Sequence, residues 1–375
     1  MKITTHSTLI ILGLTYFCFA AIKDENKRVQ SYLKVLDYDV GVVDGVIGAK
    51  TIKALKSALE EDIEIKDVKA DVNLVNSRLT HLYLKKMFEQ SKTIPHLQEK
   101  IDVSDARHFL ERVGIGAPPK EVAKIINMSR GEAIYKILNT LNSCIASAKH
   151  AEKDFAPYLI KSELSKKDKR AFRSMRNHEV SELKSWWIKE MVTTQCPQRE
   201  RLILYWTNHF SIQYSALKPY SIMIAKHHFM LRKHSFGNFK TLIKNIIKDP
   251  AIIAFLDNKY NSRFSPNENL SRELMELYVL GEGSYNEKNV KEGARALTGY
   301  TFKLEKNLQF YIDTFRKDNG QKSLFGKRGN FDGDDLVNIL FEQSSASRLI
   351  TRKFWAYFVS DVYVDNQELI NLSNL

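Results

Sequence analysis

The chain has 375 residues, which is enough for more than one domain and a sizeable hydrophobic core. Apolar residues make up 43% and aromatic residues 11%, as in an ordinary globular protein, which excludes a low-complexity or collagen-like chain. Lys and Arg number 57 against 44 Asp and Glu, and a net charge of +13 suits nucleic acid, anionic lipid or an anionic wall polymer. Because the basic residues are dispersed among acids, as in residues 166–170, a solvated surface is the simpler explanation.

Residues 1–20 have the three-part order of a secretory signal peptide. Lys2 precedes an apolar run over residues 9–19, and the small residues Ala20 and Ala21 precede a charged stretch. This run is shorter than the roughly 20 residues that cross a bilayer, so we expect cleavage after Ala20 rather than an uncleaved anchor. The sequence therefore predicts an exported protein of the periplasm or cell envelope, with no transmembrane span after cleavage. Export argues against nucleic acid as a partner.

Cysteine usage adds one open possibility. If Cys18 leaves with the signal peptide, Cys144 and Cys196 remain. Export permits a bridge between them, but two cysteines make no disulfide framework and their spacing alone does not bring them into contact.

Residues 27–60 are predicted to form two helices joined by a glycine-rich turn. The first helix has an apolar stripe of Val29, Leu33 and Leu36, and the second has one of Ile52, Leu55 and Leu59. Between them, Asp44-Gly45 is a strong turn signal. A calcium loop of the EF-hand type is excluded because Val42 and Gly48 stand where glycine and a carboxylate are needed.

The same stretch resembles the peptidoglycan-binding-like repeat. The matching residues include Gln30, Tyr38, Asp44, Gly45, Gly48 and Thr51, whereas Asp37 stands where that family usually has glycine. The resemblance implies a small helical module that docks on wall glycan or peptide, with Asp44, Gly45 and Thr51 as candidate ligand contacts. The alternative is a helical hairpin that keeps this pattern for its turn geometry and binds nothing.

The rest of the chain is predicted to be almost entirely helical. Residues 61–103 form a helical linker, and helices follow over residues 104–113, from 121, from 129, over 180–193 and over 197–210. Alternation typical of strands occurs only in residues 300–314. The predicted fold class is therefore all-α, with a small N-terminal helical module, a larger multi-helix domain over residues 104–375 and at most one short β-hairpin.

The most informative stretch is residues 265–281. Ser265 can cap a helix, Pro266 fits its first position, Glu268 can complete a capping box, and Gly281 suits the left-handed position after the last turn. The spacing of Leu270, Leu274 and Leu277 predicts one shared apolar face.

Glu273 lies at the border of that face. A carboxylate there is costly unless another group satisfies it, so Glu273 is either a buried structural anchor or part of a functional site, and we favour the anchor. Arg272 and Glu276 are four residues apart and are expected to pair.

Several short polar clusters lie next to predicted helix ends. They are residues 206–210, 249–251, 256–258, 266–280, 294–300 and 317–322. Together they resemble the bacterial family called domain of unknown function 1800, from about residue 104 to residue 375. Thr207 and Lys317 stand where relatives carry histidines, and relatives usually continue through more helices. The resemblance implies a helical fold and an envelope setting, but no reaction.

Two classes of function remain open. The first is an envelope protein whose module targets a helical binding or scaffold domain to peptidoglycan or another anionic wall polymer, without a cofactor or a predicted metal site, and with any protein partner unknown. The second is a carboxylate- or metal-dependent hydrolase acting on cell-wall or other polysaccharide. Its candidate catalytic residues are Glu273, Glu276, His209, Asp257 and Asp318, with Glu273, Glu276 and His209 as a possible metal set.

Overall fold

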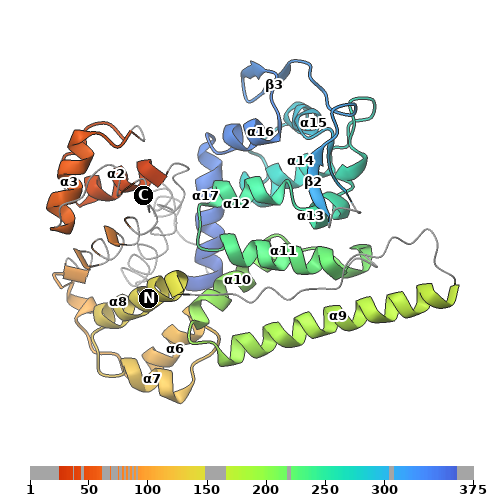
Figure 1. Ribbon diagram of the computed structural model, residues 1–375. Helices are drawn as coiled ribbons and strands as arrows, with labels where there is room; N and C mark the ends of the chain where they lie inside the picture. The colour runs from red at the N-terminus through yellow and green to blue at the C-terminus, as the bar shows by residue number, and fades with distance from the viewer. Residues whose placement is uncertain are drawn as a thin grey trace.

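The computed structural model describes residues 25–36, 38–43, 46–60, 92–147, 166–217, 221–303 and 308–360, together with single positions between 61 and 91. The described chain is mostly helical, with two short antiparallel sheets of two strands each, which confirms the predicted fold class (Figure 1). The predicted signal peptide and the residues Asp37, Asp44 and Gly45 lie outside the described residues. Within the described part, no helix is both long enough and apolar enough to cross a membrane.

Helices make up most of the chain, and the strands occur together near its C-terminal end. The α-helices are α2 (Glu25–Val35), α3 (Ala49–Leu59), α6 (Val103–Val113), α7 (Pro119–Ile125), α8 (Arg130–Ser147), α9 (Lys166–Thr193), α10 (Pro197–His209), α11 (Ser221–His234), α12 (Phe239–Ile246), α13 (Pro250–Phe255), α14 (Asn269–Glu273), α15 (Glu287–Ala296), α16 (Gly333–Leu340) and α17 (Ser344–Phe354). Short 3-10 helices are η1 (Pro95–Leu97), η3 (Tyr214–Leu217) and η4 (Asn258–Tyr260), and two π-helices are η5 (Leu274–Val279) and η6 (Trp355–Val359). The strands are β1 (Tyr300–Lys303), β2 (Gln309–Ile312), β3 (Lys322–Leu324) and β4 (Lys327–Gly329).

The N-terminal hairpin of α2 and α3 has its own hydrophobic cluster. Its members include Val29, Leu33 and Leu55, all fully buried, and Val68, Val75 and Leu79 from the predicted linker. The linker therefore contributes to this core. A buried amide organises the turn, because Gln30 Nε2 donates to the Val46 carbonyl at 3.1 Å and to Thr51 Oγ1 at 3.4 Å. Two of the motif residues thus serve the fold directly.

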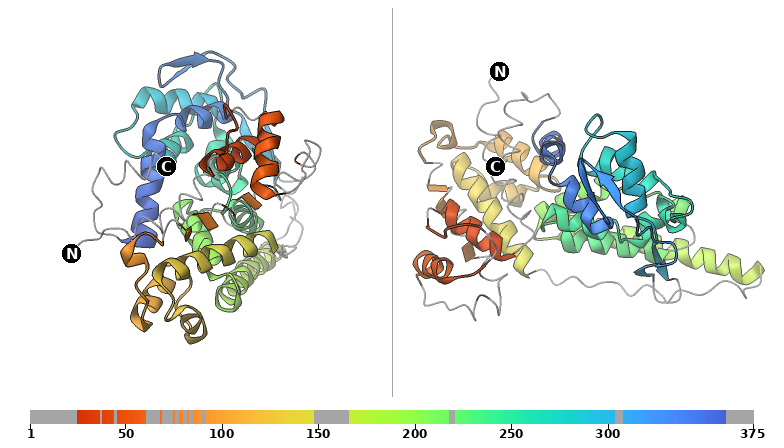
Figure 2. Two further views of the ribbon diagram at one scale, coloured as in Figure 1. Left: turned by 90° about the vertical axis from the view of Figure 1, so that its left-hand side faces the viewer. Right: turned by 90° about the horizontal axis from the view of Figure 1, so that it is seen from above.

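Helices α9, α10 and α11 pack together through a buried ion cluster centred on Glu200. Glu200 is fully buried, and Arg232 donates to its two oxygens at 2.7 Å each. Trp187 Nε1 on α9 donates to the same carboxylate at 3.0 Å. Because the charge is paired and hydrogen-bonded, its burial is tolerated. Helix α9 extends past α11 in both figures and begins well before the predicted residue 180 (Figures 1 and 2).

A second buried pair fixes the start of α13. Asp249 Oδ1 accepts from the Ala251 amide at 2.7 Å, as an N-cap should, while Oδ2 faces His227 Nδ1 at 2.9 Å. The other ring nitrogen, Nε2, faces the Phe210 carbonyl at 3.1 Å. Both ring nitrogens therefore face acceptors. This explains the Asp249-Pro250-Ala251 motif as a structural one.

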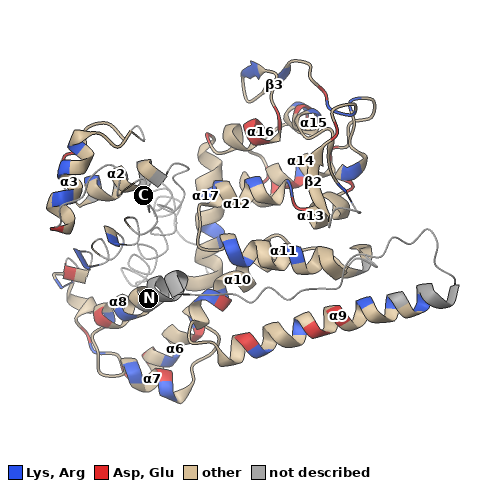
Figure 3. Ribbon diagram, in the orientation of Figure 1, with Lys and Arg blue, Asp and Glu red and all other residues tan. Residues whose placement is uncertain are grey.

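The largest hydrophobic cluster joins α10, α12, the α14–η5 segment, α16 and α17. Its fully buried members include Phe210, Leu270, Leu274, Met275 and Leu336. Lys and Arg are spread over most of the helices with Asp and Glu among them (Figure 3). Cys196 at the start of α10 is disulfide-bonded. The side chains of Cys18 and Cys144 are outside the described residues, so the bridge between Cys144 and Cys196 stays an open possibility.

The helix around Glu273 differs from its prediction at its start and in one ion pair. It begins at Asn269, not at Pro266, and Glu268 stands at its cap position with its side chain bound to Arg272 at 3.0 Å. Arg272 also binds Glu287 at 2.7 Å, so the predicted Arg272–Glu276 pair is wrong. Glu287 lies on the next helix and no local spacing rule anticipates it. Gly281 has the predicted positive φ, +87°.

The predicted apolar face is also interrupted. Leu270 and Leu274 are fully buried, but Leu277 is 46% exposed. The cause is the π-helix η5, whose wider turn moves every later side chain around the axis. Gly281 and Leu280 both donate to the Met275 carbonyl, which closes this wide turn.

Two hairpins replace the single one that the sequence predicted. Strands β1 and β2 pair from Tyr300–Ile312 to Lys303–Gln309, within the predicted region. The unpredicted pair β3–β4 has only three residues per strand, too few for a visible alternation. Its turn is Phe325-Gly326, both at positive φ, as in a tight two-residue hairpin.

Candidate functional site

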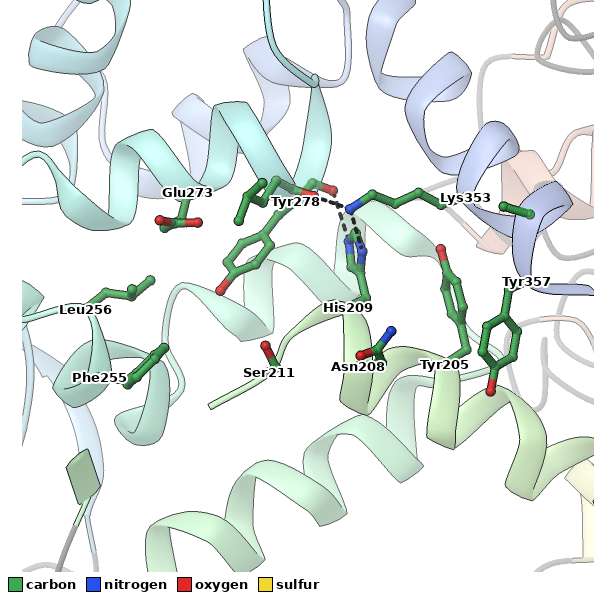
Figure 4. Close-up of a pocket in the computed structure, with 12 residues that line it drawn as sticks. Tyr205, Asn208, His209, Ser211, Phe255, Leu256, Glu273, Tyr278, Lys353 and Tyr357 are labelled. Carbon is green, nitrogen blue, oxygen red and sulfur yellow. Dashed lines mark hydrogen bonds between the residues drawn. The ribbon is translucent and has the colours of Figure 1, made fainter. Parts of the chain in front are cut away.

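A pocket of about 650 Å³ lies between α10, α13, the α14–η5 segment and α17 (Figure 4). Its lining residues are Tyr205, Asn208, His209, Ser211, Phe255, Leu256, Glu273, Leu277, Tyr278, Lys353, Ala356 and Tyr357. They come from four segments far apart in the sequence. The size and the mainly apolar lining with a few polar groups are typical of a ligand site.

His209 and Lys353 form the pocket's cationic side. Nε2 of His209 lies 3.2 Å from the Tyr278 carbonyl oxygen, which can only accept, so this nitrogen carries the hydrogen. Nδ1 then accepts from Lys353 Nζ, also at 3.2 Å. Burial and the Lys353 ammonium lower the pKa of His209 to about 3, so the ring is neutral near neutral pH. His209 therefore positions Lys353 and does not offer the pocket a free basic nitrogen.

Lys353 has donor capacity left. Its ammonium carries three hydrogens, and two are used by His209 and by the Leu277 carbonyl at 2.7 Å. That carbonyl belongs to η5, so the π-helix supplies both the exposed Leu277 side chain and the acceptor that holds Lys353. Burial and the neighbouring Arg352 lower the pKa of Lys353. The third hydrogen is available to a bound molecule.

Glu273 forms the opposite, acidic side. Figure 4 shows its carboxylate across the pocket from Lys353, with the Tyr278 ring between them. No described residue forms a hydrogen bond or an ion pair with this carboxylate. Burial and the nearby Glu276 raise the pKa of Glu273. The favoured interpretation of Glu273 as an ion-paired structural anchor is therefore wrong, because Arg272 binds Glu268 and Glu287 instead.

Three tyrosines give the pocket its aromatic walls. Tyr205 and Tyr278 are buried, and Tyr357 lies half-buried 5.2 Å from the Tyr205 ring. Burial and the Glu273 charge raise the pKa of Tyr278, so its hydroxyl stays protonated and can donate. The Arg201 guanidinium lies over the Tyr357 ring, 4.5 Å from its centroid.

Of the predicted catalytic residues, His209 and Glu273 line the pocket, and the other three do not. Glu276 accepts from the Tyr285 hydroxyl at 2.8 Å, and Asp257 is exposed in a left-handed turn at φ +57°. Asp318 is bound by Arg295 Nε at 2.8 Å. Burial alone would raise the pKa of Asp318, but hydrogen bonds from Arg295 and from the Gly320 amide lower it. Asp318 thus anchors a turn.

Most of the remaining polar clusters are structural as well. Asn258 donates to the Leu297 and Tyr300 carbonyls, and Asn261 donates to the Ala294 carbonyl at 2.9 Å. Thr207, where relatives carry histidine, donates back to the Ile203 carbonyl one turn earlier. The described residues contain no group of three or more His, Cys, Asp and Glu side chains arranged to hold a metal ion, so the set of Glu273, Glu276 and His209 does not form.

In the N-terminal hairpin, the candidate ligand contacts separate. Asp44 and Gly45 lie outside the described residues, while Thr51 is buried and receives the Gln30 amide. Thr51 therefore holds the turn and does not face a ligand. The exposed groups beside the turn include two apolar side chains, Val42 (77%) and Val46 (66%), and the ion pair of Asp39 with Lys50.

Sequence reasoning missed Lys353, Tyr205 and Tyr357. None of them belongs to the polar clusters that drew attention, and Lys353 stands in an ordinary basic stretch, Arg352-Lys353. The one usable signal was the cluster of four aromatic residues within 354–358, which a regular helix places on one broad face. Only the packing of α17 against η5 brings Lys353 to His209.

The depressed His209 pKa leads to a testable pH dependence. Between pH 6.5 and about 3 the unfolded histidine takes up a proton that the folded one does not, so His209 contributes stability that is lost as pH falls through this window. We expect His209→Gln to flatten the dependence of unfolding free energy on pH in that window. Urea denaturation at several pH values measures it, and equal slopes for both proteins would contradict the assigned neutral, buried ring.

The family model described as Protein of unknown function (DUF1800) matches residues 108–372. This range contains the pocket and every polar cluster noted in the sequence. Neither a curated protein nor a solved structure matches the chain.

Proposed function

The chain belongs to the family described as Protein of unknown function (DUF1800), and from the geometry of its pocket we propose that this domain binds a saccharide-containing wall polymer. One observation carries the proposal. A single pocket of about 650 Å³ holds a carboxylate with no hydrogen-bond partner among the described residues, Glu273, and an ammonium with a hydrogen to spare, Lys353, between tyrosine rings.

These groups suit a saccharide with an acidic substituent. A sugar presents apolar C–H faces that pack on aromatic rings, and hydroxyls that donate to a carboxylate. Glu273 offers such an acceptor, and Lys353 offers a donor to a ring oxygen or a carboxylate substituent. The cavity has room for one or two sugar units, since ligand pockets of several hundred Å³ accommodate small molecules of that size.

The N-terminal hairpin is proposed to place this domain at the wall. Its resemblance to the peptidoglycan-binding-like repeat supports that role, as do the exposed Val42 and Val46 beside the turn. Export to the periplasm or envelope is supported by the signal-peptide pattern and by the disulfide at Cys196, because disulfides persist in oxidising compartments.

Co-sedimentation with purified peptidoglycan sacculi tests the targeting role. We expect the mature chain to pellet, and Val42→Asp combined with Val46→Asp to lower the pelleted fraction several-fold because the apolar contact is replaced by charge. Val103→Asp is the matched control, another exposed valine, in α6 and outside the hairpin. Equal pelleting of all three proteins would remove the hairpin from the proposal.

Hydrolysis is the second candidate, favoured by the raised pKa of Glu273, which suits a general acid. Glycoside hydrolases ordinarily use two carboxyl groups on either side of the bond. Glu273 is the one carboxylate among the described residues that line the pocket, and the neutral His209 has both nitrogens engaged. The arrangement therefore supports binding better than cleavage.

A further inference from the structure

A second surface feature lies on η4 with the turn that follows it and on the turn after β2, and none of its residues lines the pocket. It consists of Lys259, Tyr260, Arg263, Phe264 and Phe315, and we call it the aromatic–cationic patch. Tyr260 and Phe264 are each 65% exposed and Phe315 is 68% exposed. Large apolar side chains gathered at the surface in this way mark an interaction site more often than scattered ones do.

The patch is held rigidly in place. The Arg263 guanidinium packs on both phenyl rings, 4.7 Å from the Phe264 centroid and 5.3 Å from the Phe315 centroid, and the two rings contact each other with centroids 5.6 Å apart. The Arg263 amide donates to the Arg316 carbonyl at 2.8 Å, which ties the two turns together. Asp313 fixes the second turn by accepting from the Phe315 and Arg316 amides. The hydrogen-bonded backbone of the two turns therefore holds the phenyl rings exposed to solvent.

Both cations of the patch are available to an anion. No carboxylate of the described residues forms an ion pair with Lys259 or with the exposed Arg263, whereas Arg199, Arg232, Arg295 and Arg316 each have one. Lys259 Nζ instead lies over the Tyr260 ring, 4.7 Å from its centroid. An arginine packed on aromatic rings keeps N–H groups free for a phosphate or carboxylate.

We propose that the aromatic–cationic patch is a docking surface for an anionic phospholipid membrane. The phenyl rings carry no polar atom, so they suit insertion at the lipid interface better than hydrogen-bonded contact with sugar hydroxyls. Tyr260 adds an exposed amphipathic ring on the neighbouring η4, and Lys259 and Arg263 supply the charges for lipid phosphate groups. The net charge of +13 attracts the whole chain to such a surface.

Vesicle co-sedimentation of the mature chain tests the proposal. We expect binding to phosphatidylcholine vesicles that contain phosphatidylglycerol, and little binding to phosphatidylcholine alone. Phe264→Ala or Phe315→Ala should lower the partition coefficient by about tenfold, and Arg263→Gln by about fivefold. Excess inorganic phosphate should leave binding intact, because the rings need a lipid interface. Displacement by phosphate would reassign the patch to free anions and overturn the membrane docking.

Matched controls separate the patch from general stickiness. Ile188→Ala combined with Val192→Ala removes exposed apolar surface from α9, and Lys120→Gln removes an exposed cation near the start of α7. Neither should change vesicle binding. Each patch variant should keep the wild-type unfolding midpoint, since the substituted side chains are exposed. The proposal is overturned if the wild-type chain does not bind the anionic vesicles. It is also overturned if the chain binds a soluble polyuronate through Arg263 and does not bind the vesicles.

Discussion

Glu200→Ala is expected to cost about 3–5 kcal/mol of unfolding free energy, the largest effect of any single substitution proposed for this chain. The substitution leaves Arg232 buried with its two 2.7 Å acceptors gone, and the Trp187 indole loses its partner as well. A buried cation without its counter-charge is far more costly than a missing ion pair at the surface. Urea denaturation followed by circular dichroism measures the loss.

Two companion variants identify the cause. Glu282→Ala, an exposed acid on the loop after η5, should change the unfolding free energy by less than about 0.5 kcal/mol. Combining Glu200→Met with Arg232→Met should recover much of the loss, because a well-packed apolar pair can replace a buried ion pair. A Glu200→Ala protein as stable as the wild type would mean that Arg232 finds another partner and that the cluster does not hold α10 to α11.

Glu273→Gln is expected to weaken binding of soluble peptidoglycan fragments by about ten- to a hundredfold, since a charged hydrogen bond contributes about 1.5–3 kcal/mol. Stability should be unchanged or slightly higher near neutral pH. The pKa of Glu273 is raised in the folded chain, so its ionisation costs stability as pH rises above the unfolded value of 4.5, and glutamine removes that cost. Calorimetric titration and urea denaturation give the two quantities.

Glu276→Gln is the matched control for this prediction. Glu276 lies on the same helical segment, but it binds the Tyr285 hydroxyl and does not line the pocket. We expect wild-type affinity from it. The affinity of the wild-type chain for the fragments should increase as the pH rises past the Glu273 pKa, because the carboxylate ionises there. This pH dependence should vanish in Glu273→Gln. If Glu273→Gln lost as much unfolding free energy as Glu200→Ala, Glu273 would have a structural role after all, and the binding role would be contradicted.

Local sequence rules predicted well where the helices and strands lie, but they predicted poorly which of their side chains face the core. The positive φ of Gly281 follows from glycine's freedom, and the hairpin of β1 and β2 lies where the alternation occurs. The exposure of Leu277 does not follow from spacing, because a π-helix changes the period in the middle of the stripe. Three-residue strands such as β3 and β4 are too short for any periodic signal.

The site was predictable only in part. Glu273 was identified because a carboxylate beside an apolar stripe demands an explanation. Its environment was not predictable, because Arg272 turns to Glu287 on the next helix and Lys353 arrives from α17, much further along the chain. Thr51 shows the converse, since a motif residue that looks like a ligand contact is a buried acceptor for Gln30. Pairings between distant helices decide which motif residues face a ligand.

The most direct test of the pocket's role follows bound and cleaved ligand in one sample. Soluble peptidoglycan fragments are incubated with the wild-type chain, and both the protein-bound fraction and newly formed reducing ends are measured over time. A binding domain predicts fragments that associate through Glu273 and are recovered intact. Reducing ends that accumulate with the wild type and not with Glu273→Gln would contradict it and establish a hydrolase, and fragments that never associate would contradict the saccharide as the ligand.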